Sequence, residues 1–145
     1  MTRGYAAVAV DSIKNPFNVG GVIRAAQVYD AAMVVLGSQR YKHEPSDAMK
    51  GYRHLPVLRM EDIMAAVPFD CVPVAVELVE GAQPLHGYRH PERAFYVFGG
   101  EDCTLGARIL SRCRDVIQIP THGPMNLAAC VNVVLYDRLA KSLRD

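Results

Sequence analysis

The amino-acid sequence predicts one α/β domain in which helices cover a mostly parallel sheet on both faces. Short strands alternate with helices along the chain, and the strands are continuously apolar instead of alternating between apolar and polar residues. The length of 145 residues suits a single domain with its own core and is too short for two. A composition with 50% hydrophobic and 21% charged residues excludes an intrinsically disordered chain.

We expect three strands and two helices in the first half of the chain. Apolar runs bounded by turn residues predict buried strands at 5–11, 33–36 and 55–58. Apolar residues at helical spacing predict a helix over 20–29, and a shorter helix is expected at 61–66. Residues 39–53 are polar and basic, which predicts a long exposed connection with a turn of helix at 46–49.

The second half repeats the alternation. We expect strands at 71–76, 94–98 and 116–119. A short helix is expected at 107–113, and a long one at 126–143. Pro73 has no backbone N–H to donate, so it favours an edge strand or an irregular strand start.

The C-terminal helix is apolar on nearly every side. Residues 127–136 contain one clearly polar side chain, Asn132. A helix that is apolar all round must bury more than one face. The second face is either a subunit interface or part of a core that encloses the helix fully, and the pattern fits both.

The charge balance does not by itself point to nucleic acid. The 16 Lys and Arg residues face 15 Asp and Glu, which gives a net charge of +1. Arg outnumbers Lys twelve to four, so a local phosphate-binding patch remains open. Because no apolar run approaches the roughly 18 residues that cross a bilayer, and the first ten residues lack signal-peptide features, we expect a cytoplasmic protein.

The four cysteines are Cys71, Cys103, Cys113 and Cys130, and none forms a C-x-x-C pair. A zinc site requires ligands paired at short spacing. In a cytoplasmic chain such cysteines are reduced and behave as small apolar residues. We therefore expect no structural metal and no disulfide.

The first candidate site segment is Asn15-Pro-Phe-Asn18-Val-Gly20-Gly21-Val-Ile-Arg24, which follows the first expected strand. Glycines at a helix start allow close backbone approach, and helix N-termini bind anions. Arg24, one turn further, could add a charge-assisted bond to the same anion. The alternative is that Asn18 is a plain N-cap and Arg24 a solvated surface charge.

The second candidate segment, Phe98-Gly-Gly-Glu101-Asp102-Cys-Thr-Leu-Gly106, follows another strand. Ligands of α/β sheets bind at the carboxyl ends of strands, where these residues are expected. Glu101 could accept a hydrogen bond from a ligand or hold Arg24, or both acids could simply cap a helix. The spacing is that of neither a Rossmann fingerprint nor a P-loop.

The third candidate segment, Ile119-Pro-Thr-His122-Gly-Pro-Met-Asn126, lies directly before the long helix. Two prolines and a glycine restrict its backbone, and Asn126 is expected at or near the helix cap. An ordinary loop with an Asn cap has the same pattern. His122 could line a site or face water.

Together the three segments resemble the motifs of the SpoU-type (TrmH-like) RNA 2′-O-ribose methyltransferases of the SPOUT class. The family's first motif, N-P-x-N-x-G-x-x-x-R, is matched by Asn15, Pro16, Asn18, Gly20 and Arg24. The second motif, a strand followed by F-G-x-E, is matched by Phe98, Gly99 and Glu101. The third motif, I-P-x and then S-[LM]-N before a helix ending L-Y, is matched by Ile119, Pro120, Met125, Asn126, Leu135 and Tyr136. The resemblance covers nearly the whole chain. Two positions depart from it, since Pro124 replaces the serine and Thr104 a common glycine.

The resemblance implies an α/β fold whose C-terminal part is tied in a trefoil knot. The knot would form the S-adenosylmethionine pocket from the loops of the second and third motifs and the loop after the preceding strand. The cofactor-binding residues implied on this sequence are Val76, Glu77, Gly99, Ile119, Pro124, Met125 and Leu127. Backbone groups of these loops suit the adenine edge, and the apolar side chains suit its faces.

The resemblance also implies methyl transfer from a sulfonium to a ribose 2′-oxygen. The catalytic candidates are Arg24, Asn18, Glu101 and Asn126. A guanidinium with a pKa above about 12 is a poor base, so we expect Arg24 to clamp phosphate and ribose oxygen and stabilise negative charge. Glu101 would orient Arg24 or act through it, and the two asparagines would fix the motif loops.

The partners implied are RNA and a second copy of the chain. Similar family members are homodimers in which the partner's motif-one arginine completes each site. The chain resembles a minimal domain over 1–145 without an appended RNA-binding domain, so residues 40–54 are the candidate RNA contact, although the same segment could be a solvated loop. Minimal members commonly modify tRNA, which is the first expected substrate, with ribosomal RNA second.

Three other functions remain open from the sequence. A catalytically lapsed SPOUT-fold protein that binds cofactor or RNA without methyl transfer is suggested by Pro124. A generic α/β nucleotide-binding module would have no affinity for S-adenosylmethionine. Base methylation fits the broader SPOUT class but not these SpoU-like motifs.

Overall fold

A computed structural model describes residues 4–13, 15–37, 54–100 and 105–144, and shows the α/β fold that the sequence predicts. The strands are β1 (Tyr5–Asp11), β2 (Met33–Leu36), β3 (Val57–Arg59), β4 (Val72–Val76), β5 (Gln83–Pro84), β6 (Arg93–Gly99) and β7 (Asp115–Gln118). They form one seven-stranded sheet in the order β3-β2-β1-β6-β4-β7-β5, and every pairing is parallel. The helices are α1 (Pro16–Val28), α2 (Ala107–Leu110) and α3 (Leu127–Arg144), with 3-10 turns η2 (Ile63–Ala66) and η3 (Leu85–Gly87).

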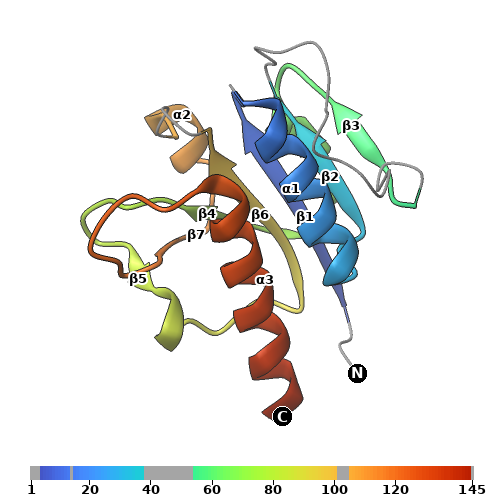
Figure 1. The fold of residues 1–145 in the computed structure, drawn as a ribbon. Coiled ribbons are helices and arrows are strands. Elements are labelled where there is room, and N and C mark those ends of the chain that lie inside the picture. The colour runs from blue at the N-terminus through green and yellow to red at the C-terminus, as the bar shows by residue number, and fades with distance from the viewer. Residues whose placement is uncertain (1–3, 14, 38–53, 101–104, 145) are drawn as a thin grey trace.

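Both faces of the sheet are buried, which explains why its strands are continuously apolar. Helices α1 and α3 lie side by side on one face (Figure 1), where they cover Val8, Val10, Tyr96 and Phe98. The alternate residues of β1 and β6 point to the other face and pack with η2, Leu105 and the end of α2. Alternation along each strand thus supplies two cores from one apolar run.

Helix α1 begins four residues before the expected position. The side chain of Asn15 accepts a hydrogen bond from the backbone N–H of Phe17 at 2.9 Å, so Asn15 is the N-cap and Pro16 the first helical residue. Asn followed by Pro is a strong helix start signal. The interpretations of Asn18 as the cap and of Gly20 and Gly21 as the helix start are therefore wrong.

Gly21 serves helix packing. A Cβ atom at this position would lie 2.7 Å from the Cβ of Ala128 on α3, which is closer than two carbon atoms can pack. The missing side chain therefore lets α1 and α3 approach each other closely over the sheet.

Most other elements lie within two residues of their expected bounds, and the differences have local causes. Strands β1 and β2 match their predictions. The expected helix at 61–66 is a single 3-10 turn, and that at 107–113 ends at Leu110. β5 and η3 were not expected, because elements of two and three residues carry no periodicity. The turn of helix expected at 46–49 lies outside the described residues.

Pro73 does not mark an edge strand, because β4 lies inside the sheet between β6 and β7. The expectation of an irregular start fits better. β4 pairs with β6 from Val72, but with β7 only from Val74 onward. The Pro73 carbonyl accepts a hydrogen bond from the N–H of Arg114 at 3.0 Å, one residue before β7 begins. Pro73, which has no backbone N–H to donate, therefore lies one residue before the pairing of β4 with β7 begins.

Helix α3 is buried on one side and is not fully enclosed. Leu127, Val131, Val134 and Leu135 face the core, whereas Tyr136 is 58% exposed. Tyr136 contacts Tyr29, just past the end of α1, edge to face with ring centroids 6.5 Å apart. Within the described ranges, no helix combines the length and hydropathy that crossing a membrane requires.

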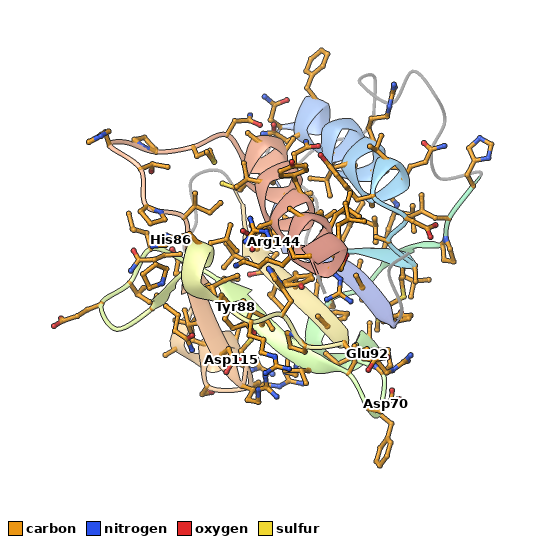
Figure 2. All side chains as sticks on the ribbon, turned by 90° about the horizontal axis from the view of Figure 1, so that it is seen from below. Asp70, His86, Tyr88, Glu92, Asp115 and Arg144 are labelled. Carbon is orange, nitrogen blue, oxygen red and sulfur yellow. The ribbon has the colours of Figure 1, made fainter. Side chains whose placement is uncertain are left out.

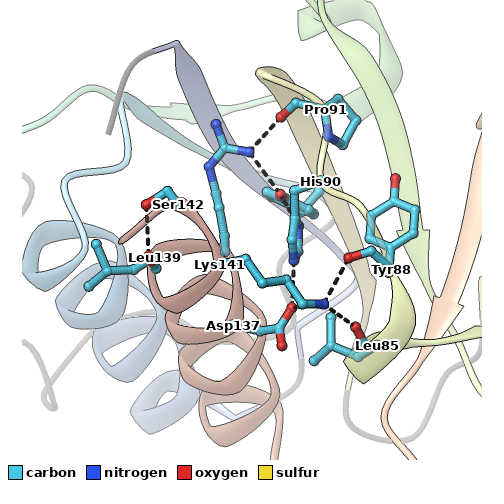
Figure 3. A network of polar contacts seen from close by, with 10 residues as sticks. Leu85, Tyr88, His90, Pro91, Asp137, Leu139, Lys141 and Ser142 are labelled. Carbon is cyan, nitrogen blue, oxygen red and sulfur yellow. Dashed lines mark hydrogen bonds and ion pairs between the residues drawn. The ribbon is translucent and has the colours of Figure 1, made fainter. Parts of the chain in front are cut away.

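A polar network anchors the C-terminal half of α3 to the chain around η3 (Figure 3). The ring of His90 contacts Tyr96 Oη through Nδ1 and Asp137 Oδ2 through Nε2, both at 2.7 Å. Lys141 Nζ lies 2.7 Å from the same carboxylate and donates to the carbonyl oxygens of Leu85 and Tyr88. Since Arg138 donates to Tyr96 Oη, the tyrosine proton is free to point at His90, which suits a neutral imidazole.

The same network continues to the end of the sheet. The Tyr88 hydroxyl donates to Asp115 at 2.6 Å, and both residues are labelled in Figure 2. Arg114 donates to the same carboxylate at 2.9 Å and, with the Tyr88 bond, keeps the pKa of Asp115 below its ordinary range. Burial and this hydrogen bond raise the pKa of Tyr88 far above its ordinary value.

Candidate active site

A pocket of about 240 Å³ lies at the carboxyl ends of three adjacent strands. It is formed by the residues that end β4, β6 and β7, the loop that follows β7, and the first turn of α3. Ligands of parallel sheets bind at this edge because the loops that leave neighbouring strands meet there. The location agrees with the sequence-based expectation.

All seven residues implied as cofactor ligands line this one pocket: Val76, Glu77, Gly99, Ile119, Pro124, Met125 and Leu127. Leu78, Phe98, Gly100, Thr121 and Gly123 also line it and lie in the loop segments that the resemblance implied, whereas Gln118 and Cys130 lie outside those segments and were not expected. Cys130 follows Leu127 by three residues on α3, so helical spacing from a motif residue was a usable signal. Among the described residues, the lining combines apolar side chains with loop backbone and one carboxylate, that of Glu77, which suits a ligand with an apolar heterocycle and a few polar groups.

Asn18 and Asn126 join the first and third motifs directly. Asn126 Nδ2 donates to Asn18 Oδ1 at 2.9 Å, although the residues are 108 positions apart. Asn126 Oδ1 accepts from the N–H of Ala129 at 3.1 Å, so the same side chain caps α3. Asn18 is the one polar residue among the buried residues that the structure describes, at 7% exposure. The bond therefore ties α1 to the start of α3 beside Met125, which lines the pocket.

The loop after β6 lies against the turn after β1. A Cβ on Gly100 would lie 1.9 Å from the carbonyl oxygen of Ser12, so no other residue fits without moving the backbone. Ser12 itself has a positive φ of 57°, which places its carbonyl in this unusual direction. The contact brings the second motif against the chain that leads into the first.

Glu77 links two loops of the pocket. Its two carboxylate oxygens accept from the backbone N–H groups of Leu78 at 3.0 Å and Leu105 at 2.7 Å. Its own N–H donates to the carbonyl of Ile117 at 2.9 Å, which extends the pairing of β4 with β7.

A family model for the SpoU rRNA methylase family matches residues 5–136, which is nearly the whole chain. The chain belongs to this family. An uncharacterized tRNA/rRNA methyltransferase of Archaeoglobus fulgidus is 26% identical over 147 residues, which cover 94% of this chain and 65% of that protein. The chain thus spans somewhat less than two thirds of the length of this curated relative.

Solved structures of SpoU proteins share the fold. The SpoU methyltransferase AviRb from Streptomyces viridochromogenes, solved with AdoMet, superposes with a TM-score of 0.82 at 19% identity, covering 99% of this chain and 60% of that one. A structure concerned with the 2-OH methylation of C/U34 on tRNA has a TM-score of 0.82 at 21% identity, covering 99% of this chain and 94% of that one. At these identities the similarity shows the fold.

The SpoU motif residues are only partly brought together. Arg24 is exposed on α1 and does not line the pocket formed by the described residues of its own chain. Glu101, the acid of the second motif, and Thr104 lie outside the described residues, so the expected pairing of Glu101 with Arg24 stays a prediction. His122 is exposed and does not line this pocket either, which favours the solvent-facing alternative.

In this SpoU protein, burial disfavours the thiolate form of the three described cysteines. Cys71, Cys113 and Cys130 are free, and burial raises the pKa of each, that of Cys113 to about 11. Within the described ranges, no three His, Cys, Asp or Glu side chains are grouped so that they could hold a metal ion. Cys103 lies outside these ranges.

Proposed function

We propose that this protein is an S-adenosylmethionine-dependent RNA methyltransferase that methylates a ribose 2′-hydroxyl, with tRNA as the first expected substrate. The pocket at the carboxyl ends of β4, β6 and β7 carries the proposal, because it gathers all seven residues that the motif comparison implied. The family supports RNA methylation as the general activity. The AdoMet complex of AviRb supports the cofactor, and the tRNA 2-OH methylation structure supports the acceptor group.

The residues of the pocket fit the cofactor chemically. Ile119, Met125 and Leu127 provide apolar surface for a purine, and the backbone of the loops after β6 and β7 provides donors and acceptors for its edge. Gly99 and Gly100 line the pocket without side chains, so their backbone is available to a ligand. When bound, S-adenosylmethionine supplies an electrophilic methyl group on a sulfonium, and the ribose 2′-oxygen takes this methyl carbon as the carbon–sulfur bond breaks.

The protein must hold the ribose hydroxyl in line with the carbon–sulfur bond and help it lose its proton. Arg24 is the leading candidate for the first task and for stabilising the negative charge on oxygen, since a guanidinium keeps its proton. Asn18 and Asn126 hold α1 against the start of α3, next to the pocket residue Met125, through their mutual bond. Glu101 is proposed to orient Arg24 or to act through it.

The exposed position of Arg24 supports a site shared between two copies of the chain. Arg24 lies away from the pocket lining of its own chain, and the exposed apolar side chains Phe17 and Val28 on α1 and Tyr136 on α3 provide a surface for a second copy. In a symmetric dimer the same patch meets itself, and in the dimer that we propose Arg24 of each copy lies at the pocket of the other. We propose this homodimer as the active form, in the cytoplasm.

The RNA contact is proposed for residues 40–54, whose basic side chains include Arg40, Lys42, Lys50 and Arg53. Because each phosphate contact releases counterions, RNA affinity through this segment falls steeply with salt. A weak salt dependence would instead agree with a solvated loop.

Calorimetric titration with S-adenosylhomocysteine tests the proposal. We expect micromolar binding to the wild type and its loss in Gly99→Val, since Gly99 lines the pocket and a bulkier residue there should crowd a bound ligand. The matched control is Gly87→Val, where an added Cβ meets nothing within 4 Å. Absence of binding to the wild type, or equal binding by Gly99→Val, would contradict the cofactor site.

A second candidate is a lapsed SpoU protein that binds the cofactor or RNA without methyl transfer. Pro124 lines the pocket at the position where the resemblance places a serine, and it has no hydroxyl to offer. Binding of S-adenosylhomocysteine without transfer to any tRNA or ribosomal RNA would favour this candidate.

A further inference from the structure

Glu77 is the one charged side chain among the described residues that line the pocket. Its half-buried carboxylate accepts from the backbone N–H groups of Leu78 at 3.0 Å and Leu105 at 2.7 Å. Both donors are neutral amides, so they satisfy the carboxylate oxygens without cancelling the negative charge. In the part of the chain that the structure describes, the ion pairs are made by other carboxylates, those of Asp62, Asp70, Asp115 and Asp137.

The other polar side chains of the described lining bring no positive charge. Gln118 Nε2 and the Thr121 hydroxyl each donate to a backbone carbonyl, at 3.0 and 2.7 Å respectively. The Cys130 thiol stays neutral, since burial raises its pKa. The first turn of α3 contributes the positive end of the helix dipole, equivalent to about half a charge, which offsets Glu77 only in part. The lining that the structure describes therefore carries a net negative charge.

The methyl donor and its product differ in charge. S-adenosylmethionine carries a positive sulfonium, whereas S-adenosylhomocysteine has a neutral thioether sulfur and lacks the methyl group. Their adenine, ribose, ammonium and carboxylate groups are identical. A negative charge in a partly desolvated pocket attracts the sulfonium more strongly than a charge in open water would, because the effective dielectric constant is lower there.

We propose that Glu77 makes this pocket selective for charge, so that it binds the cationic methyl donor more tightly than the neutral product. This inference rests on the proposed function. The two backbone bonds of Glu77 hold the carboxylate at the pocket wall, and its charge discriminates between the two ligands. The pocket thus favours entry of the donor and release of the spent product.

Calorimetric titration with both ligands tests the inference. The measured quantity is the Kd of S-adenosylhomocysteine divided by that of S-adenosylmethionine, for each protein. We expect this ratio to be about ten or more in the wild type and about tenfold lower in Glu77→Gln, which keeps the size of the side chain and removes its charge. The methyl group is the same in both measurements, so the change in the ratio isolates the charge.

Two further variants separate charge recognition from a role in holding the loops. Glu77→Asp keeps the charge, but its carboxylate is one methylene shorter and cannot hold both N–H donors in the same way. We expect both Kd values to rise in Glu77→Asp while the ratio stays well above that of Glu77→Gln. Glu80→Gln is the matched control, because it removes a charge from an exposed residue in the same loop that does not line the pocket, and its ratio should equal the wild-type value.

The outcomes distinguish this inference from the proposed function. Failure of the wild type to bind either ligand would overturn the proposed cofactor site and this inference with it. Wild-type binding of both ligands with equal or tighter binding of the neutral product would overturn charge selectivity alone, and this result needs no variant. A ratio in Glu77→Gln within about twofold of the wild type would do the same, even if both affinities fall, because a purely structural role weakens the two ligands equally.

Discussion

Asn126 connects two helices through a single side chain: its amide nitrogen donates to Asn18 of α1 and its oxygen caps α3. The side chain thereby couples three segments of the chain, namely the first motif, the third motif and the long C-terminal helix. The bond is partly buried and Asn18 itself is buried, so its loss removes a hydrogen bond where water cannot readily replace it.

Asn126→Asp separates the two roles of this side chain. Aspartate keeps the oxygen that caps α3, but it has no N–H to donate and places a negative charge against Asn18 Oδ1. We expect a loss of about 1 to 3 kcal/mol in the free energy of unfolding, from the lost hydrogen bond and the charge placed beside a buried acceptor. Chemical denaturation of Asn126→Asp, Asn18→Ala and the double variant measures this.

The double variant is the control for that prediction. Once Asn18 is alanine, Asn126→Asp should cost much less, so the two changes are not additive. Strictly additive losses would show that the two side chains do not interact.

Gly21→Ala should destabilise the protein even though alanine favours helices. The new Cβ would lie 2.7 Å from that of Ala128, and overpacking of this kind costs about 1 to 3 kcal/mol, against a helix propensity gain of up to about 1. Ala128→Gly should restore stability when combined with Gly21→Ala, because it removes the atom that clashes. Equal effects of Gly21→Ala in both backgrounds would exclude the contact.

Gly100→Ala and Gly106→Ala form a matched pair in one loop. A Cβ added to Gly100 would lie 1.9 Å from the carbonyl oxygen of Ser12, whereas a Cβ added to Gly106 would have no atom within 4 Å. We expect Gly100→Ala to lower the unfolding midpoint and to abolish S-adenosylhomocysteine binding, and Gly106→Ala to do neither. Two variants that both bind like the wild type would mean that the loop accommodates a side chain freely.

The free energy of unfolding should decrease as the pH is lowered below about 6.5, because of His90. Burial lowers the pKa of His90 below its ordinary value of 6.5, despite the opposing hydrogen bond and charge of Asp137. Below pH 6.5 the unfolded chain therefore binds a proton more readily than the folded one, so the free energy of unfolding decreases as the pH falls further. Above this pH the imidazole is neutral in both states and contributes no pH dependence.

Denaturation curves between pH 8 and about pH 5 measure this effect in the wild type and in His90→Gln. The variant should lose the part of the pH dependence that His90 causes. His86→Gln, an exposed histidine on the same segment, should leave the profile as it is. A His90→Gln profile parallel to the wild type would contradict the assignment.

Mixing two inactive variants tests whether the site is shared between copies. Arg24→Ala should retain S-adenosylhomocysteine binding but lose methyl transfer, whereas Gly99→Val should lose the cofactor. In a shared-site dimer, a mixed pair has one pocket with an intact Gly99 and the partner's intact Arg24. Random mixing should therefore restore about a quarter of wild-type transfer, since half of the dimers are mixed and carry one active site of two. No recovery would place Arg24 and the pocket in the same copy.

The location of the pocket could be predicted from the sequence, because parallel strands bring the loops after their carboxyl ends to one edge. The apolar runs at 71–76, 94–98 and 116–119 were enough to place the loops that follow them. The motif residues Gly99, Ile119 and Met125 line one pocket, and their binding of a cofactor stays a prediction. Local patterns were sufficient here, since each prediction depended on a strand and the residues directly after it.

Long-range contacts could not be predicted in the same way. The Asn18–Asn126 bond depends on how α1 and α3 cross, and the packing that sets this crossing includes Gly21, which seemed to belong to the helix start. The bond between Glu77 and Leu105 likewise joins two loops with no common pattern. His90 and Asp137 are 47 residues apart, and neither lies in a motif.

The most direct test of the central claim is analysis of tRNA nucleosides after incubation with the protein and S-adenosylmethionine. Digestion and mass spectrometry distinguish a methyl group on the ribose from one on the base. We predict one 2′-O-methylated nucleoside that forms with the wild type and not with Gly99→Val. A methyl group on a base, or no methylation of tRNA or ribosomal RNA, would contradict the account.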